Sequence, residues 1–225
     1  MDTSLLIWDF NGTLLDDTWL IVEVNNQMNL ERGLAPMSLE YYREHFTHPP
    51  KPFYTELGYD WEKETYAQVS REFMDRYEER RNEVSLTDHA LEVLEWAKNH
   101  HLPQIILSAH NQQRLEEQLE RLGILSYFEK VSGNSDLVIT GKVQRGIELS
   151  KTLSYDFSKA VVIGDTSHDC ETAQAMGCQC ILYSGGQGCG EKLRACSSCV
   201  VSSLAEIPSL LESTIDKGAN HHGNH

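Results

Sequence analysis

The chain has 225 residues, which suits one sizeable core domain with an insertion, and its formal net charge is −15. This acidic balance disfavours nucleic-acid and anionic membrane partners, because no basic patch is available to neutralise phosphates. No apolar run is long enough to span a bilayer, and the first strand signal follows Met1 so closely that it leaves no room for a signal peptide. We therefore expect a cytoplasmic protein, a monomer or homodimer, that binds neither nucleic acid nor membrane.

The first feature in chain order is a short apolar run, Leu5 to Trp8, that predicts a buried strand ending at the carboxylate of Asp9. The chain then turns at Asn11-Gly12. In an open α/β sheet, ligands bind just beyond the C-terminal ends of the strands. Asp9 therefore lies where a nucleophile would be presented.

The next segment, from Asp16 to about Ser85, loses the strand signals and takes on helical periodicity. Apolar residues spaced three or four apart (Tyr66, Val69, Phe73 and Tyr77) predict a buried helical stripe. Ser38 is a plausible N-cap, and Gly58 a helix end. Helices are expected at residues 18–30, 39–46, 51–57 and 61–81.

A turn within this helical segment, Thr47 to Lys51, contains two prolines, His48 and Lys51. The two basic side chains could offer positive charge to an anionic substrate. The simpler interpretation is a helix–helix turn, since proline often occurs in loops. We regard the two as equally supported by the sequence.

Strands and helices alternate in the remainder of the chain. Such alternation is typical of a parallel, doubly wound α/β sheet. Helices are predicted at 88–100, 112–122, 143–153 and 170–176, and strands at 104–107, 130–132, 160–163, 178–183 and 199–201. The expected organisation is an α/β core domain formed by residues 1–15 and 86–225, with an inserted all-helical cap domain at 16–85.

Four polar residues occur at the ends of these predicted elements. Ser108 follows one strand, Lys142 opens a helix, Asp165 ends another strand, and Asp169 lies four residues further on. Two strands that deliver carboxylates to one sheet edge predict a site for Mg²⁺, which prefers carboxylates, waters and phosphate oxygens. Simpler roles are a helix cap for Ser108, a surface position for Lys142 and helix N-terminal positions for the two acids.

In this order, the residues resemble the motifs of the haloacid dehalogenase-like (HAD) superfamily of aspartyl-nucleophile hydrolases, in its phosphoglycolate phosphatase-like branch. Asp9-Phe10-Asn11-Gly12-Thr13 matches the first motif except at Asn11, where phosphatases of the family have a second aspartate. Ser108 matches the second motif, Lys142 the third, and Gly164-Asp165 with Asp169 the fourth. The resemblance covers essentially the whole chain.

The resemblance implies a Mg²⁺-dependent phosphohydrolase that acts on a small phosphorylated metabolite. Asp9 would attack phosphorus and form an aspartyl-phosphate, while Asp169 would orient Lys142 and a metal-bound water. The metal site would comprise Asp9, the main-chain carbonyl of Asn11, Asp165 and Asp169. The phosphate would be held by Ser108, Ala109, His110 and Lys142, with His48 and Lys51 contacting the rest of the substrate.

Asn11 is the reason to consider alternative functions. The aspartate that the family has at this position donates and accepts a proton during the reaction, and asparagine cannot. Such general acid–base help is worth about 10²–10⁴-fold. The substrate would then have an acidic leaving group, or His110, His48 or Lys51 would move the proton, or turnover would be slow. The alternatives are a catalytically impaired or regulatory phosphate-binding protein, and a phosphonate hydrolase or phosphomutase.

All six cysteines lie in the C-terminal part of the chain. Cys196 and Cys199 have the spacing of zinc ligands, and histidines follow in the tail. Reduced thiols in or beside strands are the better-supported interpretation, since Cys178 and Cys180 lie in an apolar segment and no second ligand pair completes a zinc site. The six are Cys170, Cys178, Cys180, Cys189, Cys196 and Cys199, and the tail histidines are His221, His222 and His225.

Overall fold

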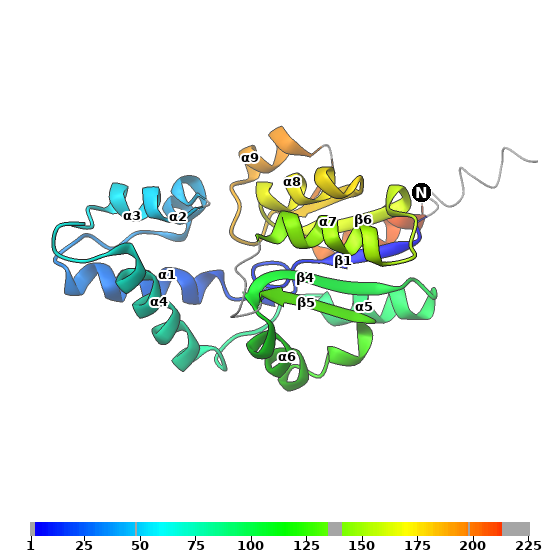
Figure 1. The fold of residues 1–225 in the computed structure, drawn as a ribbon, viewed down its shortest axis with the longest axis horizontal. Coiled ribbons are helices and arrows are strands. Elements are labelled where there is room, and N and C mark those ends of the chain that lie inside the picture. Colours follow the sequence, from blue (N-terminus) through cyan, green and yellow to red (C-terminus); the bar gives the residue numbers. More distant parts are fainter. Residues whose placement is uncertain (1–2, 48, 135–140, 198, 213–225) are drawn as a thin grey trace, which may run out of the picture. The chain divides into compact units, whose positions relative to one another are not determined.

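The computed structural model describes residues 3–47, 49–134, 141–197 and 199–212 and divides the chain into two compact units (Figure 1). One unit comprises Met1–Leu15 and Leu86–His225, and the other comprises Asp16–Ser85. Two short strands, β2 (Leu15–Asp16) and β3 (Ser85–Leu86), pair with each other. The sequence predicted no strand at either position, because two-residue strands carry no alternating pattern.

The first unit contains a six-stranded sheet in the order β5-β4-β1-β6-β7-β8. Every neighbouring pair is parallel, and Ile7 in β1 lies opposite Ile105 on one side and Val162 on the other. The strands span Leu5–Trp8 (β1), Gln104–Asn111 (β4), Lys130–Asn134 (β5), Ala160–Gly164 (β6), Gln179–Tyr183 (β7) and Val200–Val201 (β8).

Helices cover both faces of this sheet. Figure 1 shows α5 and α6 on one side and α7 and α8 on the other. The predicted doubly wound parallel sheet is therefore confirmed. The helices span Ala90–Asn99 (α5), Gln112–Arg121 (α6), Lys142–Thr152 (α7), Ser167–Met176 (α8) and Gly190–Cys196 (α9), with 3₁₀ turns at Leu125–Tyr127, Phe157–Lys159 and Leu204–Glu206.

The core of this unit explains why these strands form. Both β1 and β6 are buried along their whole length, as expected for strands covered by helices on two faces. Leu5, Ile7, Ile105 and Val162 belong to one buried cluster, against which Cys178, Cys180 and other partly buried side chains pack. The two thiols therefore behave as small apolar groups, in line with the simpler interpretation of the cysteines.

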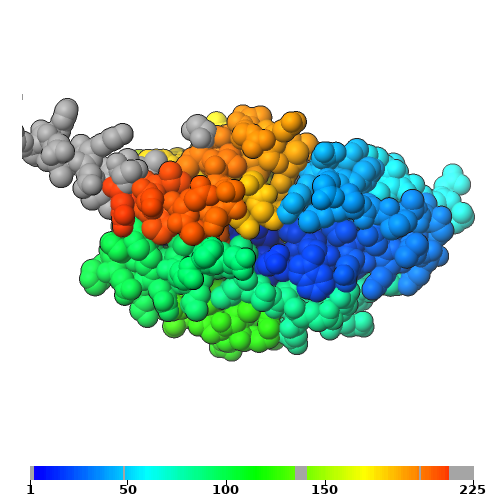
Figure 2. Space-filling model, turned by 180° about the vertical axis from the view of Figure 1, so that it is seen from behind, coloured from blue at the N-terminus to red at the C-terminus, as the bar shows by residue number. Residues whose placement is uncertain are grey.

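The end of the described chain returns to the same unit. The Trp96 Nε1 atom of α5 donates a hydrogen bond to Glu212 Oε1 at 3.2 Å. Figure 2 shows the C-terminal segment, in red, beside the green region that contains α5. Residues 207–212 are helical, and neither this turn nor α9 was predicted, since each is a short segment next to glycine- or serine-rich chain.

The second unit is helical, with α1 at Thr18–Glu31, α2 at Leu39–His45, α3 at Lys51–Leu57 and α4 at Tyr66–Arg80. Ser38 caps α2 by accepting a hydrogen bond from the Tyr41 amide, and Gly58 ends α3, both as predicted. The prediction was wrong at the start of α4, which was placed at Trp61. Thr65 and Gln68 form a capping box that starts the helix five residues later.

Two further predictions concern β4 and the cysteines. The strand predicted to end at Leu107 continues to Asn111, so Ser108 lies within β4, and Asn111 is the residue that caps α6. All six cysteines are free thiols, and none belongs to a group of metal-ligating side chains among the described residues. The tail histidines lie outside those residues.

No helix that the structure describes is long and apolar enough to cross a membrane.

Candidate active site

The site lies where the strand order of the sheet reverses. From β1 the chain reaches β4 on one side and β6 on the other, so the C-terminal ends of three adjacent strands meet in the middle of the sheet. Ligands of doubly wound folds bind at such a switch point. Asp9 follows β1, Asp165 follows β6, and Ser108 lies near the end of β4.

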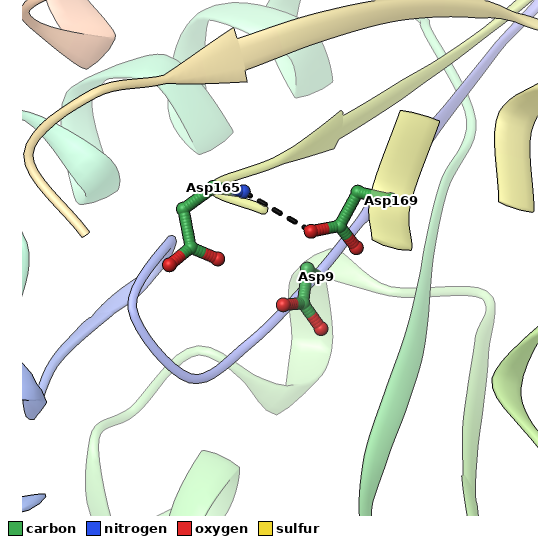
Figure 3. Close-up of side chains that lie close together, drawn as sticks. All are labelled: Asp9, Asp165 and Asp169. Atoms are coloured by element: carbon green, nitrogen blue, oxygen red, sulfur yellow. Dashed lines mark hydrogen bonds between the residues drawn. The ribbon is translucent and has the colours of Figure 1, made fainter. Parts of the chain in front are cut away.

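Three carboxylates lie close together at this edge (Figure 3). One oxygen from each of Asp9, Asp165 and Asp169 lies within 4.8 Å of the other two. Asp165 is 0% exposed and Asp169 1% exposed, whereas the Asp9 side chain retains 13% exposure. Asp9 is therefore the carboxylate of the three that a substrate reaches most easily.

Lys142, at the start of α7, joins two of the three carboxylates. Its Nζ atom lies 2.6 Å from Asp9 Oδ1 and 2.5 Å from Asp169 Oδ1, and its side chain is only 5% exposed. Lys142 is thus a buried residue and not a surface lysine. Although burial works against its charge, the carboxylates of Asp169 and Asp9 raise its pKa, so the ammonium stays protonated.

The carboxylates themselves differ in their ionisation. Burial raises the pKa of Asp9 to about 6, partly offset by the Lys142 ammonium. Burial and the charges of Asp9 and Asp169 raise the pKa of Asp165 well above its usual value. Although burial opposes it, the Lys142 ammonium and hydrogen bonds from Thr166 hold the pKa of Asp169 below its usual value. Asp169 is therefore the counter-ion of Lys142, while Asp165 is costly to ionise.

The fourth-motif acids are held by local hydrogen bonds. Asp169 Oδ2 accepts hydrogen bonds from the Asp165 amide at 3.2 Å, drawn in Figure 3, and from the Thr166 amide at 3.0 Å. Thr166 and Asp169 also form the capping box of α8. A Cβ atom on Gly164 would lie 2.2 Å from Asp169 Cγ, so only glycine permits this approach.

The other side of the site depends on the turn after β1. Gly12 has φ +76°, and a Cβ atom there would lie 2.2 Å from Asp165 Oδ2. Asp165 accepts hydrogen bonds from Thr13 Oγ1 at 3.0 Å and from the Gln187 amide at 2.6 Å. The main chain of Asn11 forms an isolated bridge with Leu15 in the same turn. The turn and the glycine-rich loop thus orient both oxygens of Asp165.

The end of β4 completes the site. Ser108 is buried, and its Oγ atom accepts a hydrogen bond from the His110 amide at 3.1 Å. The His110 ring lies 6.5 Å from the ring of Phe10, centroid to centroid, so it is next to the turn that follows Asp9. Ala109, between Ser108 and His110 in the chain, is exposed. This segment therefore presents a hydroxyl and main-chain groups beside the carboxylates.

The donor set fits a hard divalent cation. Three carboxylates lie around one ammonium, and in the described part of the chain Lys142 is the one cation paired with them. Ionisation of all three would leave two negative charges uncompensated in a buried place, which is unfavourable without a further positive partner. Mg²⁺ takes oxygen ligands of this kind. Each oxygen of Asp165 and of Asp169 also accepts a hydrogen bond from the protein, and Asp169 is in addition the counter-ion of Lys142.

The predicted site residues divide into two groups by unit. Residues of the α/β unit gather at the switch point: Asp9, Asn11, Ser108, Ala109, His110, Lys142, Asp165 and Asp169. Lys51 belongs to the helical unit, where its Nζ atom lies over the Trp61 ring at 5.5 Å from the centroid. His48 lies outside the described residues.

Four residues that hold the site were not predicted. Thr13 and the Gln187 amide bind Asp165, Thr166 binds Asp169, and Arg145 binds the carbonyl of Ser108. The Thr166-x-x-Asp169 spacing is a capping-box signal that the sequence contained. Arg145 is three residues after Lys142 and so shares its helix face. Nothing local in the sequence marks Gln187, because its main chain makes the contact.

Comparison with known proteins finds several that this chain resembles. The family model described as haloacid dehalogenase-like hydrolase matches residues 6–183. A phosphoglycolate phosphatase from Rhodobacter capsulatus is 25% identical over 80% of this chain and 84% of its own. Another from Pseudomonas fluorescens is 24% identical over 98% and 86%. A haloacid dehalogenase-like hydrolase from Streptococcus pneumoniae superposes with a TM-score of 0.79 at 18% identity, over 93% of this chain and 99% of that one.

Proposed function

The chain belongs to the haloacid dehalogenase-like hydrolase family, and on that premise we propose that it is a Mg²⁺-dependent phosphohydrolase of a small phosphorylated metabolite. The reaction would pass through an aspartyl-phosphate on Asp9. One observation carries this proposal: the Asp9 carboxylate lies at the switch point, 2.6 Å from Lys142 and grouped with Asp165 and Asp169.

In the first step, an Asp9 oxygen forms a bond to phosphorus as the bond from phosphorus to the leaving oxygen breaks. The lysine ammonium stabilises the negative charge of the transferring group, and the Ser108 hydroxyl and the Ala109 amide can donate hydrogen bonds to its oxygens. In the second step, a water oxygen forms a bond to phosphorus as the bond from phosphorus to the Asp9 oxygen breaks, which releases inorganic phosphate with the protons of the water and restores the Asp9 carboxylate. Asp169 keeps Lys142 in place throughout, since it accepts from Nζ at 2.5 Å.

Asp9, Asp165 and the main-chain carbonyl of Asn11 would hold the metal, with Asp169 behind them. When bound, Mg²⁺ supplies positive charge that screens the repulsion between the carboxylates and the phosphate. Thr13 and the Gln187 amide keep Asp165 oriented for this task.

Asn11 determines which substrates turn over quickly. Its side-chain amide can hydrogen-bond to the leaving oxygen but cannot protonate it. We expect fast turnover where the leaving group departs unaided, as in an acyl phosphate, an aryl phosphate or an anhydride. His110 is our candidate to move a proton instead, because its ring is next to Phe10, the residue that follows Asp9.

The helical unit, Asp16–Ser85, is proposed as a cap that selects the substrate. Lys51 is exposed and offers a positive charge, and His48 lies three residues earlier in the chain. If the two contact an anionic substrate, Lys51→Ala raises KM for that substrate and leaves KM for acetyl phosphate, which is small, nearly unchanged.

A second function is favoured by Asn11 alone. With the general acid–base residue replaced, the same site would bind a phosphate ester or hold a long-lived phosphoenzyme and act as a regulatory protein. Binding of phosphate without turnover would distinguish this function from hydrolysis.

The deciding experiment is phosphate release, with and without Mg²⁺, from acetyl phosphate, para-nitrophenyl phosphate, phosphoglycolate and sugar phosphates. Mg²⁺-dependent turnover supports the hydrolase. Turnover confined to the first two substrates supports a limit set by Asn11. Absence of turnover across the panel, in folded protein that still binds inorganic phosphate, favours the binding function.

Asn11→Asp tests the limit directly. The variant should raise kcat on phosphoglycolate by about 10²–10⁴-fold, because a carboxyl group can then exchange the proton. Acetyl phosphate is the matched control, since its leaving group is acidic, and its kcat should change far less. Equal activity of the two proteins on the alkyl ester would show that another residue supplies the proton.

A further inference from the structure

Arg145 is a second basic residue at the start of α7 that is largely buried. It lies three residues after Lys142, so the two side chains extend from one helix face, and Arg145 is only 9% exposed. Its Nη2 atom donates to the main-chain carbonyl of Ser108, and its Nη1 atom donates to Asn134 Oδ1. Asn134 Nδ2 in turn donates to the Ala109 carbonyl at 2.7 Å.

These contacts fall where β4 departs from regular pairing. Leu107 pairs with Ser132 and Asn111 with Asn134, so three residues of β4 stand opposite one residue of β5. Such a bulge turns main-chain groups out of the ladder and is common next to active sites. The carbonyls of Ser108 and Ala109 therefore need other partners, which Arg145 and Asn134 provide.

Holding a carbonyl also fixes the amide of the same peptide unit. The Ser108 carbonyl and the Ala109 amide belong to one planar group and point in opposite directions. A guanidinium that binds the carbonyl therefore aims the Ala109 N–H away from Arg145. In the same way, the bond from Asn134 to the Ala109 carbonyl orients the His110 amide, which donates to Ser108 Oγ.

We propose that Arg145 is a positioning residue that, together with Asn134, orients the Ser108–His110 segment so that its main-chain amide binds the substrate phosphate. The inference rests on the proposed function, since it assumes that a phosphate binds beside Ser108.

The experiment compares Arg145→Met with the wild-type protein. Binding of inorganic phosphate in the presence of Mg²⁺ is measured by calorimetry, and kcat and KM are measured on para-nitrophenyl phosphate. Lys151→Met, which removes an exposed charge from the last turn of the same helix, is the matched control. We expect phosphate affinity to fall about 10- to 100-fold in Arg145→Met and to stay unchanged in the control.

Two further variants separate positioning from folding. Arg145→Lys keeps the charge but has no planar fork that places one nitrogen on Ser108 and another on Asn134, so it should also weaken phosphate binding. Asn134→Ala should weaken it by a smaller factor, with little additional loss when it is combined with Arg145→Met. If Arg145→Met does not fold, the phosphate affinity of Arg145→Lys tests the proposed role of Arg145.

The outcomes distinguish the two proposals. A wild-type protein that neither binds nor releases phosphate defeats the proposed function and, with it, this inference. If the wild-type protein binds phosphate and Arg145→Met or folded Arg145→Lys binds it with the same affinity, the role of Arg145 is overturned while the proposed function stands. Addition of free guanidinium at low millimolar concentration to Arg145→Ala should restore part of the phosphate affinity, and no restoration would count against positioning.

Discussion

The two units of this protein use charged residues in opposite ways. In the α/β unit, Asp9, Asp165 and Asp169 surround Lys142, are largely buried and exceed it in charge. In the helical unit, Arg32 Nη2 lies 2.6 Å from oxygens of both Glu64 and Glu72, with all three side chains 19–27% exposed.

The difference shows which charges serve stability and which serve chemistry. Partly exposed pairs such as Arg76 with Glu31 hold helices together at a small gain in free energy. Buried carboxylates without enough positive charge lower stability, and a protein keeps them where function requires them. We therefore expect changes to the buried charges of the α/β unit to alter activity, and changes to the ion pairs of the helical unit to alter the free energy of unfolding.

The largest expected effect comes from Asp9→Asn. The amide cannot form the phosphoenzyme, so kcat on para-nitrophenyl phosphate should fall by at least about 10³-fold. The fold should persist, since the amide has nearly the same shape. Asp88→Asn, at an exposed position of the same unit, is the control and should keep full activity. Retained turnover in Asp9→Asn would reject Asp9 as the nucleophile.

A smaller effect is expected on stability and its pH dependence. Burial raises the pKa of Asp9 to about 6 and that of Asp165 well above its usual value. Between about pH 4 and pH 6 the folded protein thus binds more protons at these groups than the unfolded chain, so their contribution to stability falls as pH rises.

The Asp165→Asn variant tests whether ionisation of Asp165 lowers the stability of the folded protein. In chelator at pH 7.5 the variant should be more stable than the wild type, and the difference should shrink at pH 4. Mg²⁺ should raise the Tm of the wild type but not of the variant, because a ligand stabilises only the state that binds it. Thermal unfolding with and without Mg²⁺ measures both. A variant less stable than the wild type in chelator would contradict the assignment.

The smallest effect is expected in the helical unit. Arg32→Met removes two partly buried ion pairs and should lower the free energy of unfolding by about 1–2 kcal/mol. Phosphate affinity should not change. Lys63→Met, which removes an exposed pair with Asp60, is the control and should leave chemical denaturation unaltered. Loss of phosphate binding in Arg32→Met would contradict the expectation that charges of the helical unit serve stability and not phosphate binding.

Much of the fold was predictable because its signals are local. The apolar run before Asp9 and the glycine that ends α3 specify a strand and a helix end without reference to the rest of the chain. The start of α4 could have been found from the Thr65-x-x-Gln68 capping box. The bulge in β4 could not, because it depends on pairing with β5.

The sequence by itself determined the order of most strands and helices and the carboxylates that follow β1 and β6, since hydrophobic periodicity and turn residues act over short distances. The family resemblance implied that Asp169 orients Lys142, but only the tertiary structure decided that Lys142 also contacts Asp9 and that Arg145 binds the Ser108 carbonyl. These contacts join segments far apart in the chain. They exist because the sheet places β4, β1 and β6 side by side and buries the groups at their ends.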